Sequence, residues 1–245
     1  MVQICSIIEF IALIVGLNIT ILNLWGYCRG GFNHLFPPLY IFIMKILELF
    51  SGTESFSNVA KERGHQVFTI DNNPKFNADL CKDIINVNLK EIPFKPDIIW
   101  ASPPCEKFSV ATIGKNWNKD NTPKTKEAQD SLDLVNNTIA IIQSLNPKYF
   151  FIENPRGKLR KLINFGTRRT VSYCQYGDNR MKPTDIWTNC IKWKPKEICK
   201  PKSDCHISAP RGSRTGTQGL KNSEERAIIP KELCLDIIKE CENEN

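Results

Sequence analysis

A cysteine that follows two prolines is the clearest candidate nucleophile in this sequence. Cys105 ends the tetrapeptide Ser-Pro-Pro-Cys, directly after the apolar run DIIWA at residues 97–101. Because two prolines restrict the backbone, the thiol would be held rigidly at the end of a buried strand. A thiolate is a strong nucleophile, and a nearby cation or a helix N-terminus would lower its pKa. The alternative interpretation is an inert buried cysteine in a proline turn.

A carboxyl group follows the next apolar run of the chain. Glu153 comes directly after YFFI at residues 149–152. If the two strands are neighbours, this carboxyl could face Cys105 across a cleft. Partial desolvation would keep the carboxyl protonated, so that it could donate to a ring nitrogen. Pairing with Arg156 or Arg160 is the plain alternative.

A third group of residues predicts a pocket for an adenosine compound. The run KILELF at 45–50 ends in a glycine turn, where backbone N–H groups can approach a ligand closely. Asp71 ends the next apolar run and is placed to bind the two hydroxyls of a ribose, unless it only caps the following helix. Asp83 could accept from an exocyclic adenine amine. Since the sequence has no Walker lysine motif, phosphate chemistry is disfavoured. The candidate cofactor-binding residues are Phe50, Ser51, Gly52, Thr53, Asp71, Asn72, Asp83, Ile84 and Pro103.

Strands that alternate with helices must position these groups. Short apolar runs predict strands at 45–50, 67–70, 97–101 and 149–152, and helical spacing predicts helices at 57–63, 127–144 and 230–241. Residues 170–176 and 185–188 predict two more strands, which could pair antiparallel. The pattern indicates an α/β fold with a doubly wound, mainly parallel, Rossmann-like sheet. Ligands gather at the carboxyl ends of the strands in such sheets, and Gly52, Asp71, Cys105 and Glu153 all lie there.

Composition and charge agree with a globular protein. Hydrophobic residues make up 41% and charged residues 24% of the chain, which excludes wholesale disorder. The formal charge of +7 favours contact with a polyanion, although an ordinary basic protein could carry it as well. Several of the ten cysteines lie within apolar runs (Cys5, Cys174 and Cys234), and no secretory cleavage pattern precedes them, which favours intracellular thiols over a disulfide framework.

The first 43 residues differ from the rest of the chain. Residues 10–28 carry no charged side chain and are long enough to cross a hydrocarbon core of roughly 30 Å. The sharper interpretation is a transmembrane anchor. The interpretation that we favour is an upstream stretch joined to the protein by a misassigned start, because Met44 stands directly before the first predicted strand.

Taken in order, these motifs resemble the DNA cytosine-5 methyltransferase family, and most closely its short phage and virus forms. The resemblance rests on ELFSGTESFS, Asp71, Asp83-Ile84, SPPCEKFS and Glu153-Asn154-Pro155. It continues through CQYG at 174–177, Arg180, Lys182, DIWTN at 185–189, and Ile229-Pro230 with Leu233. It covers nearly all of 44–245 and none of 1–43. It implies a catalytic core at 44–189, a short basic target-recognition segment at 190–226, and a C-terminal helix at 227–245 that packs back against the first motif.

The resemblance also implies a reaction. Cys105 would attack carbon-6 of cytosine, Glu153 would protonate or hydrogen-bond ring nitrogen N3, and Arg180 would orient the base. The methyl donor would be S-adenosyl-L-methionine. The substrate would be double-stranded DNA with the target base turned out of the helix, and a restriction partner could exist. The alternatives are a weak or inactive relative that only binds DNA or cofactor, an amino-group methyltransferase, and an RNA methyltransferase.

Three departures from the family pattern affect these expectations. Glu54 and Ser55 replace smaller residues beside the cofactor, which predicts reduced cofactor affinity. Lys182 stands where a second arginine is frequent, and an amine is a poorer bidentate partner. The recognition segment is short, which predicts low sequence specificity or help from a partner. The candidate DNA contacts are Ser109 and Lys182 of the catalytic core and Lys192, Lys194, Arg211 and Arg214 of this segment, with Trp193 as an aromatic neighbour.

The same segment holds candidate metal ligands. Cys190, Cys199, Cys205 and His206 lie close together in the sequence, and the pattern Cys-x5-Cys-His could supply ligands. The spacing is not that of a standard paired zinc knuckle. We therefore expect no metal at this stage and keep these four residues as weak candidates.

Overall fold

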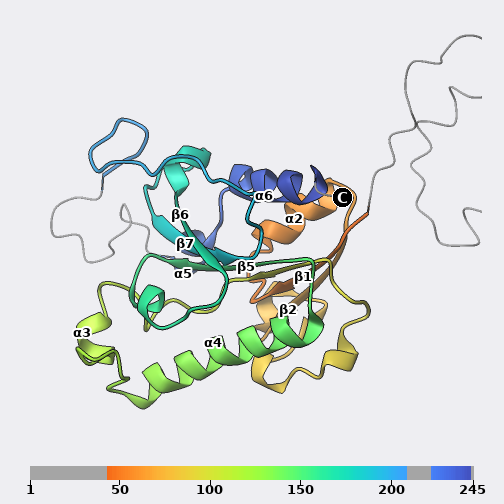
Figure 1. The fold of residues 1–245 in the computed structure, drawn as a ribbon, viewed down its shortest axis with the longest axis horizontal. Helices are drawn as coiled ribbons and strands as arrows, with labels where there is room; N and C mark the ends of the chain where they lie inside the picture. The colour runs from red at the N-terminus through yellow and green to blue at the C-terminus, as the bar shows by residue number, and fades with distance from the viewer. Residues whose placement is uncertain (1–42, 209–221, 244–245) are drawn as a thin grey trace, which may run out of the picture. The chain divides into compact units, whose positions relative to one another are not determined.

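The computed structural model describes residues 43–208 and 222–243 (Figure 1). Within this part of the chain, seven strands form one sheet in the order β3-β2-β1-β4-β5-β7-β6. The strands are β1 (Lys45–Leu49), β2 (Gln66–Asp71), β3 (Leu80–Cys81), β4 (Ile98–Ala101), β5 (Tyr149–Pro155), β6 (Thr167–Ser172) and β7 (Pro183–Thr188). The helices are α2 (Ser55–Glu62), α3 (Ile113–Asn116), α4 (Lys126–Leu145), α5 (Ser223–Ala227) and α6 (Lys231–Asn243).

The sheet is parallel over five strands and antiparallel at one edge. β3, β2, β1, β4 and β5 pair parallel, whereas β7 pairs antiparallel with both β5 and β6. The predicted doubly wound, mainly parallel fold is therefore confirmed, and so is the antiparallel pairing of the two late strands. Because β1, β2, β4 and β5 run in the same direction, their carboxyl ends and the loops that follow them meet at one edge.

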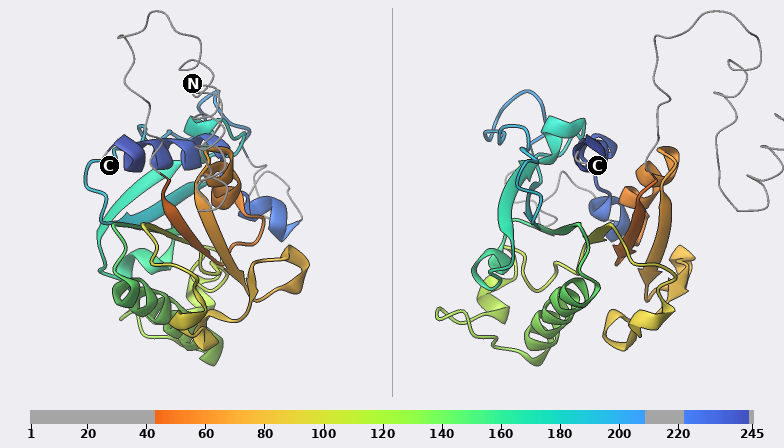
Figure 2. Two further views of the ribbon diagram at one scale, coloured as in Figure 1. Left: turned by 90° about the vertical axis from the view of Figure 1, so that its right-hand side faces the viewer. Right: turned by 45° about the vertical axis from the view of Figure 1, so that its right-hand side comes forward.

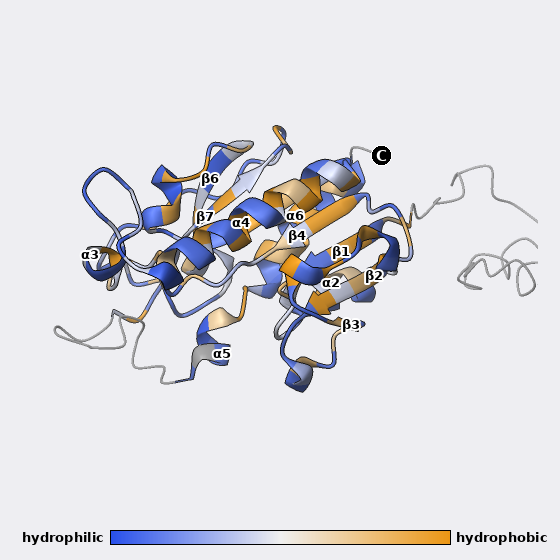
Figure 3. Cartoon of the chain, turned by 90° about the horizontal axis from the view of Figure 1, so that it is seen from below, coloured by the Kyte–Doolittle hydropathy of each residue, from blue (hydrophilic) through white to orange (hydrophobic). Residues whose placement is uncertain are grey.

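Helices cover both faces of the sheet. α2 and α6 lie side by side on one face and α4 lies on the other (Figures 1 and 2). Side chains of β1 alternate between the two faces: Ile46 belongs to the core beneath α2 and α6, whereas Leu47 and Leu49 belong to the core beneath α4. The central strands β1 and β4 are therefore buried on both sides, and Figure 3 shows them hydrophobic over most of their length.

Local signals explain where the helices begin and end. Thr125 caps α4 by accepting a hydrogen bond from the amide of Ala128 at 3.2 Å, and α4 stops at Asn146 in the left-handed region. Gly64, with φ of +84°, follows the end of α2 as the sequence indicates. The C-terminal helix packs against α2, and the amide of Ile229 donates to Ser55 Oγ at 3.2 Å. The expected return of this helix to the first motif is confirmed.

The structure differs from the sequence-based prediction in a few places. The strand expected at 170–176 ends at Ser172, because Tyr173–Tyr176 form a 3₁₀ turn that Gly177 closes with φ of +83°. The short helix α5 lies where no regular structure is expected, and Asn222 caps it. The candidate membrane segment at 10–28 lies outside the described residues. Among the residues that are described, none of the helices has the length and apolar character needed to cross a membrane.

Candidate active site

The turn after β1 brings backbone amides to the strand-end edge of the sheet. Phe50, Gly52 and Glu54 all have positive φ angles, of 59°, 46° and 54°. The chain therefore reverses sharply before α2 begins. The amide of Gly52 donates to Asp71 Oδ2 at 2.9 Å, and the amide of Asn73 donates to Asp71 Oδ1 at 2.8 Å. The Asp71 carboxylate is thus fixed in orientation, and each oxygen keeps a second lone pair that can accept from a ligand.

A pocket of about 210 Å3 opens beside Asp71. Five of the nine predicted cofactor residues line it: Phe50, Asp71, Asn72, Asp83 and Ile84. The four residues that sequence reasoning missed are Lys82, Ser102, Pro104 and Leu134. Lys82 forms an ion pair with Glu91, and Leu134 comes from the middle of α4, so neither belongs to a recognisable motif. Ser102 and Pro104 are part of the Ser-Pro-Pro-Cys motif and could have been included.

Four predicted cofactor residues are not part of the pocket lining: Ser51, Gly52, Thr53 and Pro103. The prediction for Pro103 is corrected, because this residue is buried and its carbonyl accepts from Asn154 Nδ2 at 2.9 Å, while Pro104 faces the pocket. Ser51 is buried, and its Oγ has no hydrogen-bond partner among the described residues. A buried hydroxyl without a partner costs free energy unless a ligand satisfies it. This orphaned hydroxyl and the Asp71 carboxylate fit a polar nucleoside ligand.

Glu54 lies at the start of α2 and forms an ion pair with Lys61 at 2.7 Å. Its side chain does not line the pocket. The structure therefore gives Glu54 a partner on its own helix. A larger hollow of about 390 Å3, bordered by residues 160–168 and Trp187, contains none of the predicted site residues.

Cys105 lies in the loop after β4 and is partly buried. Burial raises the pKa of its thiol, the charge of Glu153 raises it further, and the charge of Lys182 lowers it without offsetting the other two effects. A nearby cation that lowers this pKa is present, as the sequence analysis allows, but burial outweighs its effect. The thiol is held in its protonated form because desolvation and a nearby carboxylate both disfavour a second negative charge.

Glu153 lies near the end of β5, the strand next to β4, and only 6% of its surface is exposed. Tyr173 Oη donates to Glu153 Oε1 at 3.0 Å. Burial raises the pKa of this carboxyl, against the lowering effects of Lys182 and of the Tyr173 and Ser102 hydroxyls. Desolvation thus shifts this pKa in the direction that the sequence analysis expects. Of the two alternative partners, Arg160 pairs with Asp185 instead, and Arg156 is not among the groups that shift the Glu153 pKa.

Asn154 connects the two strand ends. Its amide nitrogen donates to the carbonyl of Pro103, which fixes the loop that carries Cys105 to β5. Gly157 adds a second connection, because a Cβ there would lie only 2.3 Å from the carbonyl oxygen of Phe108. The backbone of the Cys105 loop therefore packs directly on the chain that follows Glu153.

The prediction that Arg180 orients the substrate base stays a prediction, and the side chain binds groups of the protein itself. Arg180 is only 4% exposed and binds the Asp178 carboxylate through Nε and Nη2. Its remaining N–H groups donate to the carbonyl oxygens of Glu225, Arg226 and Ile228. The guanidinium is therefore surrounded by acceptors of the protein itself. Through these hydrogen bonds Arg180 connects the loop after the Tyr173 turn to the segment that leads into α6.

Lys182, predicted as a DNA contact, lies nearer to the reacting groups than Arg180. Its ammonium donates to the carbonyl of Arg226 at 2.7 Å and lies 4.5 Å from the centre of the Tyr173 ring. Burial lowers its pKa, whereas the charges of Glu153 and Cys105 raise it. Lys182 is therefore the cation that faces the Cys105–Glu153 pair, a position that the linear sequence does not reveal.

The remaining DNA candidates are placed in different surroundings. Lys192 and Lys194 are exposed, and the Ser109 hydroxyl contacts Thr112 Oγ1 at 3.1 Å in the loop after Cys105. Trp193 is not an exposed aromatic neighbour of DNA, because it is 1% exposed and donates to Asp236 at 2.9 Å. The other two candidates, Arg211 and Arg214, lie outside the described residues.

The candidate metal ligands separate into two groups. Cys190 belongs to the hydrophobic core, with 1% of its surface exposed, so its candidacy as a ligand is corrected. Cys199, Cys205 and His206 converge with Cys174, which the sequence places in an apolar run. The sequence therefore indicates three members of this cluster and misses the fourth.

Comparison with known proteins gives a consistent result. The family described as C-5 cytosine-specific DNA methylase matches residues 44–170. A Frog virus 3 (isolate Goorha) protein named probable DNA (cytosine-5)-methyltransferase is 34% identical over 218 residues, which span 81% of this chain and all of the viral protein.

Solved structures with similar backbones are more distant in sequence. A putative DNA modification methyltransferase encoded within an E. coli prophage is 17% identical, with a TM-score of 0.44 over 64% of this chain. A variant of Spodoptera frugiperda DNMT2 is 20% identical, with a TM-score of 0.40 over 68% of this chain. Entamoeba histolytica methyltransferase EhMeth is 16% identical, with a TM-score of 0.46 over 65% of this chain. The match spans 52% of the first of these chains and 57% of the other two.

Proposed function

This chain belongs to the C-5 cytosine-specific DNA methylase family, and we propose that it transfers a methyl group to carbon-5 of cytosine in double-stranded DNA. Members of this family use S-adenosyl-L-methionine as the methyl donor. The observation that carries the proposal is the placement of Cys105 and Glu153 on adjacent parallel strand ends, beside the pocket that Asp71 borders. A nucleophile and an acid are thus held next to a nucleoside pocket.

The cofactor pocket supplies the polar groups that an adenosine needs. Asp71 would accept from the ribose hydroxyls and Asp83 from the adenine amine. The pocket is smaller than the roughly 300–1,000 Å3 of typical small-molecule sites, so the methionine part of the donor extends beyond it. When bound, the donor supplies an electrophilic methyl group to carbon-5.

Cys105 and Glu153 activate the base together. The Cys105 thiol loses its proton and its sulfur forms a bond to carbon-6, while Glu153 gives a proton to ring nitrogen N3. The electrons of the carbon-5–carbon-6 double bond then become available at carbon-5. After methylation, a base removes the carbon-5 proton, the sulfur–carbon-6 bond breaks, and the N3 proton returns to Glu153. The Cys105 sulfur leaves as a thiolate and takes back from water the proton that the thiol gave to water, so every group of the protein is restored.

The proton arrangement of the free protein suits this sequence of events. Burial raises the pKa of the Glu153 carboxyl, which favours its protonated form, and burial also raises the pKa of Cys105, which favours the thiol over the thiolate. The ammonium of Lys182 favours the thiolate when it forms, because an opposite charge nearby stabilises it. Arg180 acts indirectly as a positioning residue, since it holds the segment whose Arg226 carbonyl anchors Lys182.

DNA binding is proposed to rest on exposed cations of the segment that follows β7. Lys192 and Lys194 are exposed there, which suits contact with phosphate. We also propose, as a finer hypothesis, that a restriction enzyme of the same specificity could accompany the methylase. Protection of methylated DNA from cleavage in extracts of the source would test it.

The proposed function is tested by product analysis with the full chain. The protein and a Cys105→Ser variant are each incubated with duplex DNA and methyl-labelled S-adenosylmethionine, and the nucleosides are identified by mass spectrometry. Labelled 5-methylcytosine from the parent and none from the variant is the expected result. Label on an amino nitrogen, or on RNA alone, would assign the chain to a different methyl transfer. DNA and cofactor binding without any label would identify an inactive relative.

A further inference from the structure

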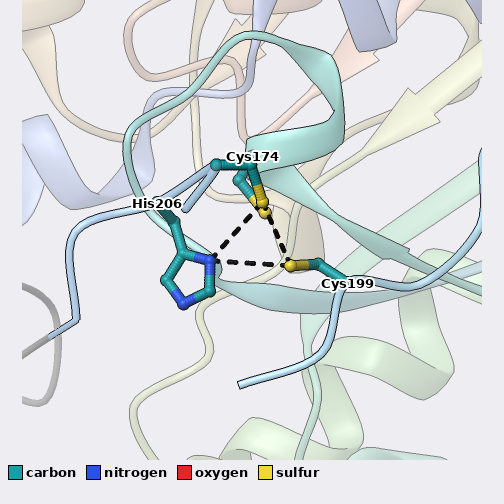
Figure 4. A group of neighbouring side chains, drawn as sticks. Cys174, Cys199 and His206 are labelled. Carbon is teal, nitrogen blue, oxygen red and sulfur yellow. Dashed lines mark hydrogen bonds between the residues drawn. The ribbon is translucent and has the colours of Figure 1, made fainter. Parts of the chain in front are cut away.

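Three cysteines and a histidine converge away from the active-site pocket, beside the turn Tyr173–Tyr176. Cys174 comes from this turn, whereas Cys199, Cys205 and His206 come from the segment that follows β7. Figure 4 shows the side chains of Cys174, Cys199 and His206 pointing toward one another. All four potential ligand atoms lie within 4.8 Å of one another. The cluster thus joins residues that are up to 32 positions apart in the chain.

The distances match the edges of a tetrahedron around a single ion. With zinc bonds of about 2.3 Å to sulfur and about 2.0 Å to nitrogen, tetrahedral angles place two sulfurs about 3.8 Å apart and a sulfur and a nitrogen about 3.5 Å apart. His206 Nδ1 lies 3.5 Å from Cys199 Sγ and 3.6 Å from Cys205 Sγ. The sulfurs of Cys199 and Cys205 are 3.2 Å apart. Small shifts would bring the four atoms onto one ion.

The surroundings of the sulfurs also suit thiolate ligands. Gln175 Nε2 lies 3.5 Å from Cys205 Sγ and 4.0 Å from Cys174 Sγ, so its amide can donate to both. Donors of this kind orient and stabilise thiolates that bind a metal. A disulfide between Cys199 and Cys205 is the competing arrangement. It would need the two sulfurs to approach from 3.2 Å to about 2.05 Å. It would also leave the convergence of Cys174 and His206 on the same point unexplained.

We propose that Cys174, Cys199, Cys205 and His206 bind one structural Zn2+. Three thiolates and one neutral imidazole complete a closed four-coordinate site, which leaves no position for substrate or water and distinguishes a structural site from a catalytic one. Binding releases the thiol protons to solvent, and no redox step is involved.

The ion would fasten the basic segment to the catalytic core. Residues 189–208 contain no helix or strand, so few backbone hydrogen bonds hold them in place. Two that do so lie beside the cluster: the amide of Cys199 donates to Ser172 Oγ at 3.1 Å, and the amide of Ile207 donates to the carbonyl of Asn179 at 2.9 Å. Asn179 directly precedes Arg180 in the sequence. A metal at this point would therefore also brace the loop that carries Arg180 and Lys182.

The test measures metal rather than methyl transfer, so it is independent of the proposed function. The full chain is purified with a tag that lacks histidine, and its zinc content is measured by elemental mass spectrometry. We expect one equivalent of zinc per chain in the parent and in Cys81→Ser, a matched control at an exposed cysteine outside the cluster. We expect the zinc to be lost in Cys199→Ser and in His206→Ala.

A second measurement keeps the proposal testable if those variants do not fold. Zinc is removed from the parent and replaced by Co2+, whose visible spectrum distinguishes tetrahedral thiolate ligands from other environments. Thiolate–cobalt bands, and protection of Cys205 from alkylation until a chelator is added, would support the site. A parent without zinc that gives no such bands would overturn it, as would a Cys199–Cys205 disulfide in protein purified under reducing conditions.

Discussion

The hydroxyl of Tyr173 offers the most specific test of how the active site sets the pKa of Glu153. Tyr173→Phe removes the hydrogen bond to Glu153 Oε1 at 3.0 Å and leaves the ring in place. The ring contact with the Lys182 ammonium at 4.5 Å is therefore retained. Because Tyr173 is fully buried, water cannot replace the lost donor without rearrangement. The substitution thus acts mainly on the carboxyl of Glu153.

The size of the effect follows from the strength of the lost bond. A hydrogen bond to a charged group contributes about 1.5–3 kcal/mol, and 1.36 kcal/mol corresponds to one pKa unit. Since this bond lowers the pKa of Glu153, its removal should raise that pKa by about 1–2 units. Methyl transfer requires the Cys105 thiolate together with the protonated Glu153, a state in which the pair holds one proton. The limb of the pH profile that reports Glu153 should therefore move to higher pH by about 1–2 units.

The assay compares kcat/KM for methyl transfer across pH in the parent, Tyr173→Phe and Tyr176→Phe. Tyr176 lies in the same turn and is also buried, but its hydroxyl accepts from the amide of Lys196. The pH dependence of Cys105 alkylation identifies which limb belongs to the thiol. An unchanged profile in Tyr173→Phe, or an equal shift in Tyr176→Phe, would refute the assignment of Glu153 as the acid.

Three further predictions concern stability, loop packing and DNA. Burial raises the pKa of Glu48 from 4.5 to about 7. Between pH 4.5 and about pH 7 the folded protein therefore binds more protons than the unfolded chain, and the free energy of unfolding falls as the pH rises through this range. Glu48→Gln should remove this fall and add up to about 3 kcal/mol at pH 8 but little at pH 4, measured by urea unfolding at both pH values. Gly157→Ala should destabilise the protein by about 1–3 kcal/mol and reduce activity, because the added Cβ would collide with the Phe108 backbone. The control is Gly114→Ala, whose added Cβ has no neighbour within 4 Å, so activity should not fall. Lys192→Ala with Lys194→Ala should lower the slope of log binding constant against log salt by about 2, and an unchanged slope would exclude both from phosphate contact.

The parts of the fold that follow local rules could be predicted from the sequence. Apolar runs of four to six residues located the central strands, because parallel strands buried on both faces leave an uninterrupted hydrophobic signal. The strand ends then indicate Asp71 and Glu153, which stand directly after such a run, and Cys105, which follows one after Ser-Pro-Pro. The 3₁₀ turn at Tyr173–Tyr176 was missed because its aromatic residues are equally typical of a strand.

Contacts between distant segments could not be predicted in this way. Arg180 is clamped by carbonyls of residues 225–228, and Lys182 faces the reacting pair only because the chain folds back there. Trp193 looks like an exposed aromatic within a basic stretch, yet its indole binds Asp236 of α6. Cys174 joins the cysteine–histidine cluster from a turn about 25 residues before the next member of the cluster. Each of these depends on tertiary packing, which the linear spacing does not encode.

The most direct test of the central claim is a covalent trap at Cys105. Duplex DNA with 5-fluorocytosine at target positions is incubated with the full chain and S-adenosylmethionine, and denatured complexes are digested and mapped by mass spectrometry. Fluorine at carbon-5 leaves no proton to remove after methylation, so the sulfur–carbon-6 bond should persist. We predict a stable adduct at Cys105 in the parent and none in Cys105→Ser. Methylation of ordinary cytosine at carbon-5 with no trapped adduct, or an adduct at another residue, would contradict the account.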